Sequence, residues 1–253
     1  MEKMTEFIAC FTRYEEFKMS EEHAPVITLD GPSGTGKGTI SLMLARQLGW
    51  HFLDSGALYR VLAYAAKKKG IDFDDIKEMV TLAYALNLRF EVNKENSSHV
   101  FLDEDNISDA IRSEQCGQDA SRIAAIPEIR KALLGRQRAF ARLPGLVTDG
   151  RDMGTVVFPN AILKIYLYAS LEERASRRYL QLKEKGNDVS LAQVVEELAK
   201  RDERDQARAH SPLKPASDAV QIDTTKLTIA QVFNNVLQLA KKRLFVQADH
   251  NSN

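Results

Sequence analysis

A glycine-rich segment at residues 31–39, GPSGTGKGT, constrains the fold of this chain more than any other feature. It matches the pattern G-x-x-x-x-G-K and lies between a β-branched run at 26–29 and a stretch with helical spacing of apolar residues that ends at Gly49. Glycines let consecutive backbone N–H groups turn inward, and the start of a helix carries about half a positive charge. The segment therefore predicts a phosphate-binding loop between a strand and a helix.

We expect this loop to hold the phosphates of ATP, with Lys37 bridging the β- and γ-phosphates as a point charge. The residues concerned are Gly31, Pro32, Ser33, Gly34, Thr35, Gly36, Lys37, Gly38 and Thr39. Gly38 follows the lysine and the hydroxyl comes one place later, at Thr39, which favours small-metabolite and nucleoside monophosphate kinases over a GTPase or an ATPase motor. The alternative is a glycine-rich turn that binds nothing, and the flanking strand and helix disfavour it.

The rest of the chain alternates between strands and helices. Apolar runs at 26–29, 50–53, 146–148, 162–167 and 219–222 predict an α/β fold with a five-stranded parallel sheet flanked by helices. Alternating apolar residues at 88–92 and 100–102 predict an antiparallel hairpin inserted into that plan, followed by helices near 114–125 and 127–142. Ser190 with Gln193 has the spacing of a helix capping box.

We interpret residues 24–247 as a single domain, with a core at about 24–70 and 145–247 and an insert at about 71–144. Residues 1–23 are expected to be an N-terminal extension and residues 248–253 a flexible tail.

Charge and composition exclude several classes of function. Lys+Arg and Asp+Glu both number 35, so the chain has no overall basic field for nucleic acid or anionic lipid. Cys10 and Cys116 form neither a zinc pattern nor a disulfide framework, and no stretch reaches the ~18 apolar residues of a membrane span. We therefore expect a cytoplasmic protein, a monomer, with no nucleic-acid or membrane partner.

Polar residues follow two of the predicted strands, where open α/β sheets bind their ligands. In DSGALYR at 54–60, Ser55 can cap the next helix, and Arg60 is either a clamp for an acceptor phosphate or a solvated arginine. In DGRDMG at 149–154, Asp149 is either a metal-directed carboxylate that acts on Mg²⁺ or a turn residue.

Two arginine trios have helical spacing. Arg174, Arg177 and Arg178 form one, and Arg201, Arg204 and Arg208 form the other, with a polar connection at 183–188. Two such helix faces predict a lid at about 178–204 that folds over phosphates. Solvated pairing of charges along each helix is the alternative.

At this point the chain resembles the bacterial cytidylate kinases of the long type. The motifs GPSGTGKGT, DSGALYR, LVTDGRDMGTVVFP, RDERDQAR and SPLKPA occur in that order, and the likeness extends from about residue 24 to residue 239. The resemblance implies a P-loop kinase fold with an enlarged monophosphate-binding insert and a short helical lid. It also implies ATP-dependent phosphorylation of CMP and dCMP to CDP and dCDP.

The resemblance implies roles for individual residues. The residues expected to bind the substrate are Ser55, Tyr59, Arg60, Ser121, Arg130, Asp152, Arg201, Asp205 and Arg208. The residues expected to be catalytic are Lys37, Arg151, Arg178, Arg201 and Arg208. Arg60 would hold the acceptor phosphate. Ser121, Arg130 and Asp152 would surround the pyrimidine. Mg²⁺ would lie near Thr39 and Asp149, with Asp149 acting through water. Residues 223–225 resemble a loop that lies along the adenine of ATP, and a plain entry into the next helix is the alternative.

The chemistry of cytosine fits a carboxylate in this pocket. Its N4 amine can donate to Asp152, whereas uracil would present a carbonyl to the same carboxylate. A mispaired buried polar group costs ~1–3 kcal/mol, which predicts roughly tenfold to hundredfold preference for CMP over UMP.

Two other functions are open to this sequence. One is a related P-loop kinase that phosphorylates UMP, AMP or shikimate. The other is a nucleotide-dependent switch or binding ATPase, for which we would expect slow ATP hydrolysis without an acceptor and stimulation by single-stranded nucleic acid.

Overall fold

The computed structural model describes residues 24–92, 98–184, 186–208 and 210–250. Its centre is a parallel sheet with the strand order β2-β6-β1-β7-β8. The strands are β1 (Val26–Asp30), β2 (His51–Asp54), β6 (Leu146–Gly150), β7 (Leu163–Tyr168) and β8 (Val220–Asp223). Every residue of β1 and β6 is buried, as expected for neighbouring strands covered on both faces. The predicted five-stranded parallel sheet is confirmed.

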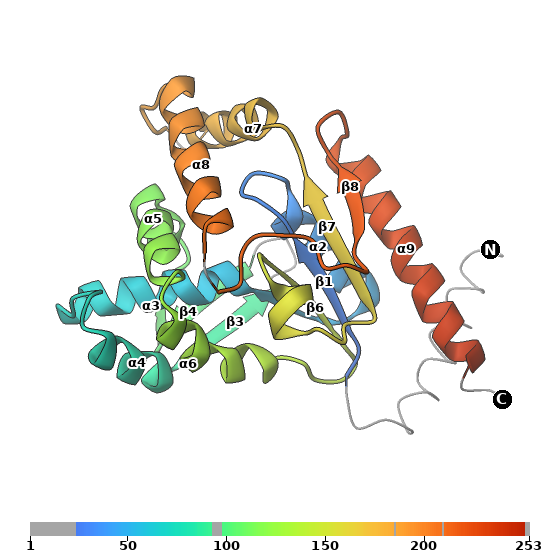
Figure 1. Ribbon diagram of the computed structural model, residues 1–253, viewed down its shortest axis with the longest axis horizontal. Helices are drawn as coiled ribbons and strands as arrows, with labels where there is room; N and C mark the ends of the chain where they lie inside the picture. The colour runs from blue at the N-terminus through green and yellow to red at the C-terminus, as the bar shows by residue number, and fades with distance from the viewer. Residues whose placement is uncertain (1–23, 93–97, 185, 209, 251–253) are drawn as a thin grey trace.

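Helices cover both faces of this sheet. On one face, α2 (Lys37–Leu48) and α9 (Ile229–His250) pack together, with Leu44 and Val236 fully buried in the same cluster. On the other face, α3 (Ser55–Lys69) places Leu58 against Leu53 and Leu146. Figure 1 shows α9 lying beside β8 at one side of the sheet.

The insert between β2 and β6 has its own core. It contains α4 (Ile76–Ala85), β3 (Leu88–Val92), β4 (Ser98–Leu102), β5 (Asp105–Asn106), a short 3-10 turn η1 (Ala110–Arg112), α5 (Glu114–Ile123) and α6 (Pro127–Arg138). The antiparallel pairing of β3 with β4 confirms the predicted hairpin, and β5 adds a third strand. Met79, Ile123 and Leu133 are fully buried against residues of α3, so α3 belongs to both cores.

A pair of helices lies above the carboxyl ends of the strands. They are α7 (Leu171–Glu184) and α8 (Leu191–Gln206); Figure 1 draws α7 above the arrowhead of β7 and α8 to its left. Ser190 and Gln193 form the predicted capping box at the start of α8. Because α8 ends at Gln206, the prediction that Arg208 lies on the same helix face as Arg201 is wrong, and Arg208 lies just beyond the helix.

The ends of the chain are described only in part. Residues 1–23 and 251–253 lie outside the described residues, so the predicted extension is not tested, whereas α9 continues through His250 into the segment predicted to be a tail. None of the helices in the described part of the chain is long and apolar enough to cross a bilayer. The division into core, insert and lid remains an interpretation.

Candidate active site

The carboxyl ends of the strands bring several aspartates to one edge of the sheet. Asp30, Asp54 and Asp223 end β1, β2 and β8, and Asp149 is the last residue but one of β6. Asp54 and Asp149 are partners in the register of β2 and β6, so their side chains start from adjacent backbone positions. The phosphate-binding loop leaves β1 at the same edge.

The loop at 31–39 has the backbone that its glycines predict. Gly31 has φ 147°, and a Cβ built there would lie 2.0 Å from the carbonyl oxygen of Leu167. Gly36, with φ 86°, immediately precedes α2. Lys37 Nζ and Thr35 Oγ1 both donate to the carbonyl of Pro32, at 2.8 and 3.1 Å.

Lys37 lies in a buried, cation-rich position. Burial, followed by the neighbouring charge of Arg151, lowers the pKa of Lys37 to about 7. A nearby anion would favour the charged ammonium and reverse this effect. The loop therefore suits a negatively charged group such as a polyphosphate.

Asp149 is suited to a hard cation. Burial raises the pKa of Asp149 well above its usual range, and the charge of Asp54 adds to this effect. Its Oδ1 is buried and makes no hydrogen bond with any described residue. An added Cβ at Gly38 would lie 3.9 Å from its Oδ2, so α2 is in contact with this carboxylate. One or two carboxylates completed by phosphate oxygens form a common Mg²⁺ site, so these residues fit the ion.

Thr39, the other predicted metal residue, has an exposed side chain one position after Gly38. Its role remains a prediction. No cluster of three or more metal-ligating side chains occurs among the residues that the structure describes.

The start of α3 differs in detail from the prediction. Asp54 accepts a hydrogen bond from the N–H of Ala57 at 3.0 Å and is the N-cap, so the expectation that Ser55 caps this helix is wrong. Ser55 is instead buried, and its Oγ donates to Gln137 Oε1 on α6 at 2.9 Å.

Arg60, one turn further along α3, spans the gap to α5. Its Nη1 donates to the carbonyls of Ile111 and Ser113, at 2.8 and 3.2 Å. A Cβ added at Gly117 would lie 2.9 Å from its Nη2. The hydrogen bonds of Arg60 to described residues thus go to neutral carbonyls, which leaves its charge available to a phosphate.

Arg130 and Asp152 form a nearly buried ion pair. The guanidinium of Arg130 lies 5.6 Å from the centre of the Tyr59 ring and also donates to the carbonyl of Ala124. A carboxylate, a guanidinium and an aromatic ring from three elements therefore lie together, as the resemblance implies.

Asp30 fixes the segment that carries Asp152. Its two carboxylate oxygens accept the N–H groups of Met153 and Gly154, at 2.9 and 2.8 Å, at the start of the single π-helical turn η2 (Met153–Val157). Burial raises the pKa of Asp30 to about 6, and the two backbone N–H groups oppose the shift. Asp30 was not among the predicted site residues.

Asp205 joins the lid to the rest of the site. It pairs with Arg151 at 2.8 Å and with Arg208, and it accepts a hydrogen bond from Ser121 on α5 at 3.5 Å. Burial opposes ionisation, but the neighbouring arginines hold the pKa of Asp205 below its usual range. One carboxylate thus connects β6, α5 and α8.

Arg201 is the least compensated cation of the site. Its Nε is buried and has no hydrogen-bond partner among the described residues. Burial, then the charges of Arg151 and Arg60, lower the pKa of Arg201 to about 9. Because Arg151 and Arg60 disfavour the charge of Arg201, an anion bound beside Arg201 would favour its charged form.

The first arginine trio is mostly paired with protein groups. Arg178 bonds to Glu114 on α5 at 2.8 Å. Arg177 pairs with Glu173 and donates to the carbonyl of Thr224.

Arg174 is almost buried. It pairs with Asp202 at 2.6 Å and donates to the carbonyl of Ser33 at 3.1 Å. It therefore connects the phosphate loop to α8. The three arginines of this trio therefore bond to protein groups here, and their contact with phosphates remains a prediction.

Comparison with known proteins agrees with this geometry. A sequence model described as "Cytidylate kinase" matches residues 27–242. A protein called cytidylate kinase from Pseudomonas savastanoi pv. phaseolicola is 56% identical over 215 residues, covering 85% of this chain and 94% of the relative. The chain belongs to the cytidylate kinase family. A cytidylate kinase from Colwellia psychrerythraea is 51% identical over 224 residues, covering 88% of this chain and 99% of that protein.

Within this cytidylate kinase family member, most of the predicted site residues come together at the sheet edge. Contacts described above connect Tyr59, Arg60, Ser121, Arg130, Arg151, Asp152, Arg201, Asp205 and Arg208 to one another or to shared neighbours, whereas Ser55 contacts Gln137. Sequence reasoning missed Gln137, Glu114 and Asp202, each of which partners a predicted residue from a distant segment. Gln137 and Glu114 lie outside every motif quoted above, whereas Asp202 lies within RDERDQAR at 201–208 and was not singled out there.

Proposed function

We propose that this protein transfers the γ-phosphoryl group of ATP to CMP and dCMP, giving ADP with CDP or dCDP. The supporting observation is the group of cations Lys37, Arg60 and Arg201, none of which forms an ion pair with a described residue, between the phosphate loop and the acceptor side. Two phosphate-bearing substrates facing each other would neutralise this group. A protein that only binds ATP would have no need of the cations on the acceptor side.

On the donor side, the backbone N–H groups of residues 31–39 and the start of α2 would hold the β- and γ-phosphates of ATP. Lys37 exchanges its bond to the Pro32 carbonyl for the phosphate oxygens. Arg174 holds the loop against α8 through the Ser33 carbonyl and acts as a positioning residue.

On the acceptor side, Arg60 binds the phosphate of CMP, and Ser55 with its partner Gln137 lies beside the nucleotide. Asp152 accepts a hydrogen bond from the N4 amine of cytosine, and Arg130 donates to a ring acceptor. The pair that these two residues form with each other holds both in orientation before the base arrives.

In the transfer step, an oxygen of the CMP phosphate attacks the γ-phosphorus, and the bond from that phosphorus to the β–γ bridging oxygen breaks. The electron pair stays on ADP. Arg151, Arg201 and Arg208 stabilise the charge that spreads over the transferring oxygens. Asp149 and Thr39 would hold Mg²⁺, which would supply further neutralisation of the phosphate charge.

The test is ADP production from Mg-ATP by the purified protein, with CMP, dCMP, UMP, AMP, shikimate or no acceptor in parallel. The proposal predicts rapid turnover with CMP and dCMP, weaker turnover with UMP and almost none without acceptor. Equal, slow ADP release in every reaction would refute it and favour the switch or binding ATPase.

We further propose that the enzyme acts in the cytoplasm as a monomer that uses Mg²⁺. The free, buried thiol of Cys116 is compatible with a reducing compartment. Light scattering coupled to size-exclusion chromatography should give the mass of one chain, 28.4 kDa. A mass of twice that value would contradict the monomer.

A further inference from the structure

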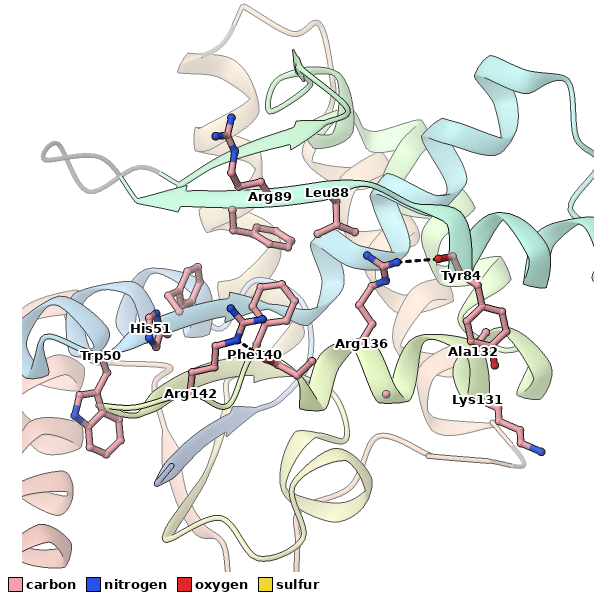
Figure 2. Close-up of a pocket in the computed structure, with 14 residues that line it drawn as sticks. Trp50, His51, Tyr84, Leu88, Arg89, Lys131, Ala132, Arg136, Phe140 and Arg142 are labelled. Carbon is pink, nitrogen blue, oxygen red and sulfur yellow. Dashed lines mark hydrogen bonds between the residues drawn. The ribbon is translucent and has the colours of Figure 1, made fainter. Parts of the chain in front are cut away.

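A groove with a volume of about 940 Å³ lies between the edge strand β2, the insert strand β3 and helix α6. Figure 2 shows the side chains that line it. They are Trp50, His51, Phe52, Tyr84, Leu88, Arg89, Phe90, Lys131, Ala132, Gly135, Arg136, Ala139, Phe140 and Arg142. None of the residues predicted for ATP, acceptor or metal binding belongs to this set, so the groove is a separate feature.

The lining is basic and contains no carboxylate. Arg136 donates to the carbonyl of Tyr84 at 3.1 Å and Arg142 to that of Ala139 at 3.0 Å, so neither charge is neutralised by these bonds. The exposed Lys131 has no hydrogen bond or ion pair with any residue that the structure describes. Four cations line the groove, and among the described residues only Arg89 forms an ion pair with a carboxylate. Its partner is Glu91, which does not line the groove. The groove therefore suits an acidic occupant.

The groove also includes an open sheet edge. β2 is the last strand on its side of the sheet, and the N–H of His51 donates to the carbonyl of Gly145 on the β6 side, at 2.9 Å. Since peptide groups alternate in direction along a strand, the N–H and C=O of Phe52 point toward the open edge. An open edge can pair with an extended chain segment.

The residues just before β1, the first strand, lie close to one end of the groove. The carbonyl of Pro25 accepts the N–H of Leu146 at 2.9 Å. A Cβ added at the adjacent Gly145 would lie 2.4 Å from the ring of Trp50, which lines the groove. Residues 1–23 therefore join the described chain beside one end of the groove.

The composition of residues 1–23 is complementary to the groove. They contain six glutamates against Lys3, Arg13 and Lys18, together with four aromatic residues, Phe7, Phe11, Tyr14 and Phe17. At ~3.3 Å per extended residue the segment has ample length. Its covalent connection gives it a high effective concentration at the groove. These residues precede the part of the chain that the family model matches.

We propose that residues 1–23 dock in this groove, with glutamates beside Arg136, Arg142 and Lys131 and a stretch of backbone paired with the open edge at Phe52. The occupant is thus a segment of the same chain, covering an edge strand that the family core leaves open.

Hydrogen–deuterium exchange tests the proposal with the full chain and a variant that begins at residue 24. The full chain should show about tenfold slower exchange at residues 50–54 and 131–142, whereas α8 should exchange equally in both proteins. Equal exchange at the groove in the two proteins would overturn the proposal. Protection that weakens on dilution would also overturn it, in favour of a second copy of the chain.

Charge reversal provides a second test in the full chain. The double variant Arg136→Glu with Arg142→Glu should lose the protection at residues 50–54. The matched double variant Lys77→Glu with Lys200→Glu changes two exposed lysines outside the groove and should keep it. Retained protection in the first variant, with its other helices exchanging as in the wild type, would contradict docking by charge.

Discussion

Replacing Arg201 with glutamine should make the nucleotide-free protein more stable while nearly abolishing its activity. Lowering the pKa of Arg201 to about 9, from the usual range of an arginine, corresponds to ~5 kcal/mol of unfavourable charge in the folded state. Attraction to Asp205 and Glu114 is already included in that pKa. The gain in the free energy of unfolding is smaller than this figure. Water reaches the half-buried side chain of Arg201, and the substitution also removes its polar contacts. We expect the free energy of unfolding to rise by ~1–3 kcal/mol, or about 3–10 °C in Tm.

The activity should change in the opposite direction. A preorganised cation that acts on the transferring phosphoryl group is worth about 10²–10³ in rate, so kcat/KM for CMP should fall by that factor in Arg201→Gln. Thermal unfolding without nucleotide and steady-state kinetics measure the two effects on the same preparation. Lys200→Gln is the matched control, because it removes an exposed i,i+4 pair with Glu196 and should change stability by less than ~0.5 kcal/mol.

One result would refute this reasoning. If Arg201→Gln lowers the free energy of unfolding by 1 kcal/mol or more while Lys200→Gln does not, the charge of Arg201 stabilises the fold. The cations would then be compensated by the protein itself. Their arrangement would no longer support a site for two phosphate-bearing substrates.

Three further predictions concern aspartates of the site. Asp149→Asn should weaken the response of kcat/KM to Mg²⁺ at least about tenfold without lowering Tm, because burial already disfavours its charge. Asp152→Asn should reduce the ratio of kcat/KM for CMP over UMP about tenfold, and an unchanged ratio would remove Asp152 from base selection. Burial raises the pKa of Asp30 to about 6 from 3.8, so its contribution favours folding below pH 4 and is lost as the pH rises through 6. Urea unfolding from pH 4 to 7 should show this loss, ~3 kcal/mol, in the wild type and not in Asp30→Asn.

The sequence predicts the phosphate loop and the sheet because both depend on local patterns. Gly31 and Gly36 are needed for backbone conformations that can be inferred from nine consecutive residues. The apolar runs of β1 and β6 show burial on both faces without any knowledge of their partners. The hairpin of β3 and β4 is equally local, since its two strands are neighbours in the chain.

The connections within the site could not be predicted because they join distant segments. Ser55 bonds to Gln137, 82 positions away, and Arg178 bonds to Glu114, 64 positions away. The N-cap of α3 illustrates the same difficulty at short range, because Asp54 and Ser55 are both good caps and the end of β2 decides between them. The resemblance supplied Ser121 and Asp205 as site residues but not the hydrogen bond between them.

Contacts of α7 and α8 with α5 bear on how a nucleotide can enter the site. Helix α8 and the middle of α7 meet α5 through Arg178 with Glu114, Arg204 with Gln118 and Asp205 with Ser121. The first two contacts are partly exposed and contribute ~0–1 kcal/mol each, whereas Asp205 and Ser121 are buried, so separating the elements also exposes their hydrogen bond to water. The repulsion between Arg201 and its neighbours Arg151 and Arg60 favours the same separation. A bound phosphate would reduce that repulsion and so stabilise the contact of α8 with α5.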